Sequence, residues 1–138
     1  MKSAKIAFWI STGLIVTFEG LLPALTFNSP LAKSGISHLG YPDYFRVALT
    51  LFKVLGAIAL IFPQVPRRIK EWAYAGFTFD FLFAAISHGA IDGVGDFQTW
   101  FPLIVLAILA VSYTSLNKIR GYSERSDRTG FVKAALIP

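Results

Sequence analysis

Four long apolar segments, none with the charged stripe of a soluble helix, constrain this chain more than any other feature. They lie at residues 6–25, 44–62, 69–88 and 97–116. The hydrocarbon core of a bilayer needs about 20 helical residues, and each segment is close to that length. Only 15% of the 138 residues are charged, whereas 54% are apolar, which is too little charge to cover a soluble bundle. The sequence therefore predicts an all-α fold, a bundle of four transmembrane helices.

The basic residues predict the orientation of these helices, because lysine and arginine gather in cytoplasmic loops. Ten of the thirteen lie at the N-terminus, between the second and third segments or at the start of the third, and after the fourth, whereas the loop between the first and second segments carries Lys33, with Arg46 just inside the second segment. The loop between the third and fourth segments has none and carries Asp92 and Asp96 instead. We therefore expect a multi-pass protein of the cell membrane with both termini in the cytoplasm. The net charge of +5 then suits contact with anionic lipid, and we expect no nucleic acid partner. The basic residues on the predicted cytoplasmic side are Lys2, Lys5, Arg67, Arg68, Lys70, Lys118, Arg120, Arg125, Arg128 and Lys133.

The segments between the apolar stretches differ in kind. The sequence Asn28-Ser29-Pro30 is typical of a helix start, so the first outer loop should hold a short extra helix. Residues 1–117 are expected to form the membrane domain. Residues 118–138 mix glycine, serine, arginine and aspartate, and we expect a basic cytoplasmic tail that is flexible or lies on the membrane surface.

Ionisable residues inside the predicted spans are the most informative about function. A charge near the bilayer centre costs at least about 2.5–3.5 kcal/mol, so it is normally paired or lines a cavity. Glu19, Lys53 and Asp80 lie roughly 9, 13 and 12 Å below the outer ends of three different helices, at 1.5 Å of rise per residue. We therefore expect Lys53 to bridge the two carboxylates in the outer half of the bundle. Arg46 and His88 lie near the outer helix ends and join the same candidate polar cluster.

Two interpretations of this cluster stay open. Buried ion pairs can fix the packing of helices without taking part in chemistry. Alternatively, the small residues on the same helix faces leave room for a ligand. No Ser-His-Asp order, HExxH motif or phosphate-cradling glycine motif is present. The loop with Asp92 and Asp96 lacks the twelve-residue frame of an EF-hand, so no metal site is expected.

Several short motifs resemble one known family. They are Glu19 followed by Pro23, the run Leu39-Gly40-Tyr41-Pro42, the run Lys53-Val54-Leu55-Gly56-Ala57, and the stretch from Lys70 to Phe77 followed by Asp80 and Ser87-His88. In this order and spacing, the chain resembles the DoxX-like family of small four-span membrane proteins over roughly residues 6–116. The resemblance implies a four-helix membrane bundle. The family takes its name from a subunit of a thiosulfate:quinone oxidoreductase, and distant relatives include assembly factors for other membrane proteins.

Two classes of function follow from the residues and the resemblance. The first is an accessory protein that binds a small hydrophobic ligand or assists another membrane protein, or a second copy of itself, through the buried polar cluster. The alternative is a membrane subunit of a quinone-linked oxidoreductase, with Glu19, Asp80 or His88 handling protons. A lipid- or sterol-modifying enzyme is a third option, so enzymatic activity stays open. The sequence contains no cysteine, so thiol chemistry by the chain itself is excluded.

Overall fold

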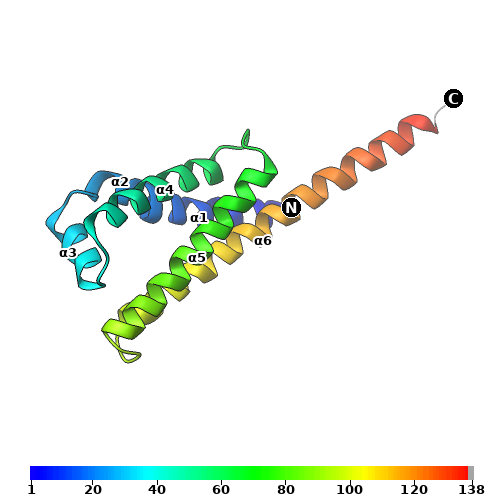
Figure 1. The fold of residues 1–138 in the computed structure, drawn as a ribbon. Helices are drawn as coiled ribbons and strands as arrows, with labels where there is room; N and C mark the ends of the chain where they lie inside the picture. Colours follow the sequence, from blue (N-terminus) through cyan, green and yellow to red (C-terminus); the bar gives the residue numbers. More distant parts are fainter. Residues whose placement is uncertain (137–138) are drawn as a thin grey trace.

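The computed structural model describes residues 1–136, and all regular structure in that range is helical. The predicted all-α fold class is therefore confirmed. A short helix begins at Pro30, where the sequence predicts one, and the Ser29 side chain accepts a hydrogen bond from the Ala32 amide. The elements shown in Figure 1 are α1 (Lys2–Ile15), η1 (Val16–Leu21), α2 (Leu22–Thr26), α3 (Pro30–His38), α4 (Asp43–Ile61), α5 (Arg67–Ile91) and α6 (Phe97–Ala135).

The first three elements form one continuous helix, Lys2–Thr26, with a wider π-helical turn at η1. Proline has no N–H and its ring crowds the carbonyl four residues earlier. Pro23 therefore cannot bond to the Glu19 carbonyl, and the Leu22 amide bonds to the Thr17 carbonyl, five residues back. Such single π turns in helices are frequent at functional sites. Glu19 lies in the middle of this turn.

The long helices pack in a closed order around a shared core. Helix α6 lies against both α1 and α5, α5 lies against α4, and α4 lies against η1. In Figure 1 the α5–α6 pair is seen side by side over most of α5. The buried core draws on all of these helices and includes Ile15, Leu60, Phe77 and Leu109.

A small hydrogen-bonded network crosses this core. The hydroxyl of Ser112 on α6 lies 2.7 Å from the hydroxyl of Thr12 on α1 and 2.7 Å from that of Tyr74 on α5. All three side chains are buried. Because each hydroxyl has a partner, the network links three helices without leaving a polar group unpaired.

Within residues 1–136, three helices are long and apolar enough to cross a membrane: Lys2–Thr26, Asp43–Ile61 and Phe97–Ala135. Helix α5 has 25 residues but does not meet the same criterion. Its sequence includes Lys70, Glu71, Asp80 and His88, which lower its hydropathy. Three of the four predicted spans are thus supported, and the span predicted at α5 stays a prediction.

Helix α6 is 39 residues long and takes in most of the predicted basic tail. It continues without interruption past residue 117 to Ala135, and Figure 1 shows this last part projecting away from the other helices. Glu124 follows Arg120 and precedes Arg128 by four residues, a spacing that stabilises helices. Proline is absent from residues 103–135, so nothing forces the helix to end. The expected boundary at 117/118 has no break in the backbone, and residues 137–138 of the predicted tail lie outside the described range.

Candidate functional site

The structure brings together Glu19, Lys53 and Asp80 from η1, α4 and α5. The Lys53 Nζ atom lies 2.7 Å from Glu19 Oε2 and 3.1 Å from Asp80 Oδ2. Lysine therefore lies between the two carboxylates, as the helical spacing predicts. The three side chains are only 14–20% exposed. We call these three residues the charged triad.

Close packing of η1 against α4 allows the triad to form. Gly20 is the residue after Glu19, and a Cβ atom built on it would stand 2.5 Å from the Ala57 Cβ on α4. On the other side of α4, a Cβ on Gly56 would meet the Phe77 ring of α5 at 2.9 Å. These two glycines let the three helix backbones approach closely enough for one lysine to reach both carboxylates.

Asp80 is the least satisfied member of the triad. Its Oδ2 atom is buried and forms an ion pair with Lys53, but no donor among the described residues hydrogen-bonds to it. Glu19, in contrast, accepts a hydrogen bond from Lys53. The 3.1 Å ion pair with Lys53 is therefore the contact that holds this oxygen among the described residues.

A groove of about 680 Å³ lies between α4 and α5, with Asp80 and Lys53 on its wall. Figure 1 shows the two helices diverging from the connection between them. Several aromatic side chains of the groove are largely exposed, including Phe52 at 70% and Trp72 at 77%. The groove therefore opens at the side of the helix bundle, where these aromatic side chains are exposed. Its lining residues are Tyr41, Phe45, Leu49, Phe52, Lys53, Leu55, Gly56, Ala59, Ile69, Trp72, Ala73, Gly76, Phe77, Phe79, Asp80 and Phe83.

A second cavity of about 430 Å³ is lined in part by residues of α3, and we call it the α3 chamber. Residues of α2, α3 and α4 form most of its wall, together with His88 and Gln98. Leu49 and Lys53 line both the chamber and the groove. The Lys53 side chain therefore stands between the two cavities.

Arg46 does not join the charged triad. Its Nε donates to Asp43 Oδ1 at 2.9 Å, and Nη1 donates to the Phe27 carbonyl. The guanidinium carbon also lies 5.8 Å from the centre of the Phe27 ring, within the range of a cation–π contact. Arg46 thus fastens the connection between α2 and α3 to α4, which the sequence alone did not indicate.

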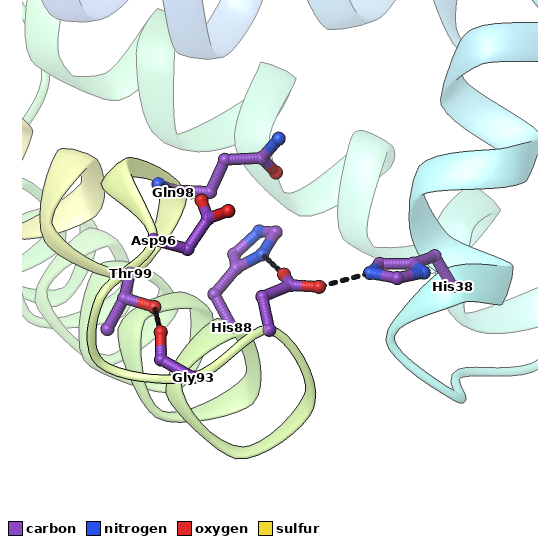
Figure 2. A network of polar contacts seen from close by, with 7 residues as sticks. His38, His88, Gly93, Asp96, Gln98 and Thr99 are labelled. Carbon is purple, nitrogen blue, oxygen red and sulfur yellow. Dashed lines mark hydrogen bonds and ion pairs between the residues drawn. The ribbon is translucent and has the colours of Figure 1, made fainter.

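His88 is also separate from the triad and belongs to a contact that the sequence analysis missed. Its Nδ1 lies 2.7 Å from Asp92 Oδ2, and His38 Nε2 on α3 lies 2.5 Å from Asp92 Oδ1. Figure 2 shows His38 and His88 approaching this carboxylate from opposite sides. The contact ties α3 to the connection between α5 and α6. Only the four-residue spacing of His88 and Asp92 is visible in the sequence; the approach of His38 depends on tertiary structure.

The hydrogen bonds from His88 and then His38 hold the pKa of Asp92 below its ordinary value of 3.8. A carboxyl whose pKa is lowered by folding stabilises the folded state above its unfolded pKa and loses that effect as the pH falls through the folded pKa. We expect Asp92→Asn to lower the thermal unfolding temperature at pH 7. The gap from the unsubstituted protein should shrink progressively below pH 3.8. Unfolding curves of both proteins in the same detergent at several pH values measure this, and a gap that does not change with pH would contradict it.

A buried lysine makes a further polar contact at the end of α4. Lys70, counted above among the basic residues of the predicted cytoplasmic side, is buried, and its Nζ donates to the Leu60 carbonyl at 2.8 Å. It therefore caps the C-terminal end of α4.

Among residues 1–136, no group of three or more histidine or acidic side chains is arranged to hold a metal ion.

Long apolar helices that enclose a charged triad, with a groove open at their side, define an all-helical membrane protein. A comparison with protein families identifies it more closely. The chain belongs to the DoxX-like family, whose model matches residues 10–112, and the DoxX family consists of small membrane proteins. The match contains all three residues of the triad. No curated protein and no solved structure matches the chain.

Proposed function

We propose that this chain is a four-span protein of the cell membrane that binds a small hydrophobic ligand in the groove between α4 and α5. The observation that carries the proposal is the groove itself. Its volume of about 680 Å³, its apolar and aromatic walls, and the two charged side chains on its lining match the usual character of small-molecule sites. Such sites measure about 300–1,000 Å³ and use a few polar groups to orient the ligand.

The direction of the helices supports four spans. Helices α4 and α6 are both candidate spans, and Figure 1 shows both running away from the end of the molecule where α3 lies. Helix α5 joins the far end of α4 to the start of α6, so it must cross back if the other two cross. Its 25 residues extend about 37 Å at 1.5 Å per residue, and the hydrocarbon core is about 30 Å thick. Pairing of Asp80 with Lys53 lowers the cost of placing α5 there.

The arrangement of the ends supports the proposed orientation. Figure 1 shows the N-terminus at the same end of the bundle as the α4–α5 connection, and the tail of α6 leaves at that end. These are the parts that carry most of the basic residues, and basic residues favour the cytoplasmic side. Lys70 contributes less to this bias because it is buried. The groove wall with Asp80 then lies in the outer half of the membrane.

Ligand binding is favoured over the quinone-linked alternative by the position of the residues proposed to handle protons. Of Glu19, Asp80 and His88, only Asp80 lines the groove, while His88 lines the α3 chamber. The side chains of His88 and Asp92 are hydrogen-bonded to each other. We therefore propose an accessory protein that holds a small hydrophobic ligand in its groove or assists another membrane protein. Electron transfer to a quinone by the purified protein would favour the alternative.

The proposal can be tested with a photoactivatable lipid in vesicles that contain the purified protein. The probe is a sixteen-carbon alcohol with a diazirine in its chain, and labelled residues are located by peptide mass spectrometry. We expect stronger labelling at Phe52, Phe79 and Trp72 than at Ile104 and Val111, which are exposed on α6 and report general contact with lipid. Equal labelling at the groove and at α6 would overturn the proposal.

A variant that fills the groove provides the control. Gly76 lines the groove, and a Cβ atom built on it meets nothing within 4 Å. Gly76→Leu should therefore reduce groove labelling severalfold while labelling at α6 stays the same. Gly121→Leu, at an equally open position in the tail of α6, should leave both unchanged. Groove labelling that survives Gly76→Leu at full strength would also count against the proposal.

A further inference from the structure

The groove is lined by one carboxylate, Asp80, whose contact with a donor of the described chain is the 3.1 Å ion pair with Lys53, and this group indicates the chemistry of the ligand. The carboxylate of Asp80 lines the groove and is 15% exposed. Its Oδ2 atom is buried and stands 3.1 Å from Lys53 Nζ, so the oxygen left for a ligand is Oδ1, which accepts no hydrogen bond from the described residues. Other carboxylates in the body of the protein each accept at least one. These are Glu19, Asp43, Glu71, Asp92 and Asp96.

We infer that the groove selects a neutral lipid alcohol, whose hydroxyl donates a hydrogen bond to Asp80 while its apolar body lies along the aromatic wall of α5. The inference rests on the proposed function, because it names the class of ligand for the same groove.

The charges around Asp80 decide between the possible head groups. Lys53 supplies one positive charge for the two carboxylates of the triad, so the site carries excess negative charge when all three are ionised. A ligand carboxylate or phosphate would be repelled by it. An ammonium group would be attracted by Asp80 but would stand close to the Lys53 ammonium, which is 3.1 Å from Asp80. An ether, ester or ketone has no proton to donate. A hydroxyl satisfies the carboxylate without adding a charge.

The walls of the groove indicate the length and the apolar character of the rest of the ligand. Phe79 and Phe83 flank Asp80 along α5, and Trp72 lies eight residues toward the inner end, about 12 Å away at 1.5 Å per residue. These side chains are 59–77% exposed. An elongated apolar chain or ring system that reaches from Asp80 to Trp72 would cover them. The open side of the groove would let such a ligand enter from the bilayer.

A matched pair of probes tests the inference. The first is the diazirine alcohol described above, and the second is its methyl ether, which has the same chain and no donor. Labelling at Phe79 and Phe83 is divided by labelling at Ile104, so that different amounts of probe in the membrane cancel. Hydrogen bonds to charged groups correspond to roughly tenfold or more in affinity. We therefore expect the corrected labelling by the alcohol to exceed that by the ether about tenfold.

Two substitutions assign this preference to Asp80. Asp80→Leu removes the acceptor and leaves Lys53 paired with Glu19, and the preference for the alcohol should disappear. Asp80→Asn keeps an uncharged acceptor, and the preference should fall to a few-fold. Helix content and elution volume verify that each variant is folded. If the folded Asp80→Leu variant keeps the full preference, the alcohol does not bind through this carboxylate and the inference is wrong.

The remaining outcomes separate the inference from the function on which it rests. Equal groove labelling by alcohol and ether, with both above the α6 value, would overturn the lipid alcohol and leave ligand binding in place. A diazirine amine of the same chain length that labels more strongly than the alcohol would overturn it in favour of a cation. If no probe labels the groove above α6, the proposed function itself fails.

Discussion

Replacing Lys53 with methionine should destabilise the folded protein by about 3–5 kcal/mol, the usual cost of removing one partner from a buried ion pair. Methionine has a similar length and suits an apolar environment, so the change removes the charge with little loss of packing. It leaves Glu19 and Asp80, which are only 14% and 15% exposed, without a cation. Two unpaired, largely buried carboxylates close to each other repel and lack solvation. Reversible unfolding in bicelles, followed by circular dichroism or steric trapping, measures the loss.

Restoring neutrality should recover much of that loss. Adding Glu19→Gln and Asp80→Asn to the Lys53→Met variant removes both stranded charges. Buried ion pairs are often replaceable by uncharged groups at small cost, so the triple variant should be clearly more stable than Lys53→Met alone. The control is Lys118→Met, which removes an exposed lysine from α6 and should change stability by less than about 0.5 kcal/mol. A Lys53→Met variant as stable as this control would show that the triad does not hold the helices together.

The triple variant also separates packing from ligand binding. If the triad served only to fix the helix packing, a folded triple variant would still take up the diazirine alcohol with the normal preference over its ether. If the ligand binds at Asp80, the preference should fall although the fold is retained. Stability and binding are therefore expected to respond differently to the same set of substitutions.

The triad was predictable because one physical requirement acts at the sequence level. A charged residue inside an apolar helix needs a partner, and helical rise places Glu19, Lys53 and Asp80 at similar depth. The distances of 2.7 and 3.1 Å confirm the expected bridge. The π turn at Glu19 follows from Pro23 by the same local logic, since a missing N–H acts within one helical turn.

Other polar side chains could not be placed, because some have partners within one helical turn and others have partners far along the chain, and depth in a helix does not separate the two. Arg46 and His88 satisfy the same rule as Lys53, but their partners are Phe27, Asp43 and Asp92, and depth alone does not distinguish these from the triad. Lys70 counts as a surface residue in any charge tally, yet it is buried against the Leu60 carbonyl. The groove depends on how far α4 and α5 diverge, which apolar periodicity leaves undetermined.

The second large effect is expected at Gly20, where a single methyl group should disturb the packing of η1 on α4. A Cβ atom at this position would stand 2.5 Å from the Ala57 Cβ, well inside the usual carbon–carbon separation of about 3.5–4.0 Å. Ala57 is 4% exposed, and its Cβ is fixed to the α4 backbone, so it cannot rotate away. One helix must move, and Gly20→Ala should cost about 1–3 kcal/mol.

The displacement should reach the neighbouring ion pair. Glu19 precedes Gly20 on η1, and Lys53 lies one turn before Ala57 on α4, so moving the two helices apart lengthens the 2.7 Å contact between them. Gly13→Ala on the same continuous helix is the matched control, because its Cβ meets nothing within 4 Å. It should be neutral or slightly stabilising, since alanine favours helices over glycine by up to about 1 kcal/mol.

A compensating substitution makes the cause specific. Ala57→Gly removes the atom that the new methyl group would strike, so the double variant Gly20→Ala/Ala57→Gly should be more stable than the sum of the single effects predicts. A favourable coupling of about 1 kcal/mol or more in this double-mutant cycle would place the clash at these two atoms, because contacting sites couple and distant ones do not. Strict additivity would mean that Gly20 is required for another reason, and the close approach of η1 and α4 would no longer explain how Glu19 reaches Lys53.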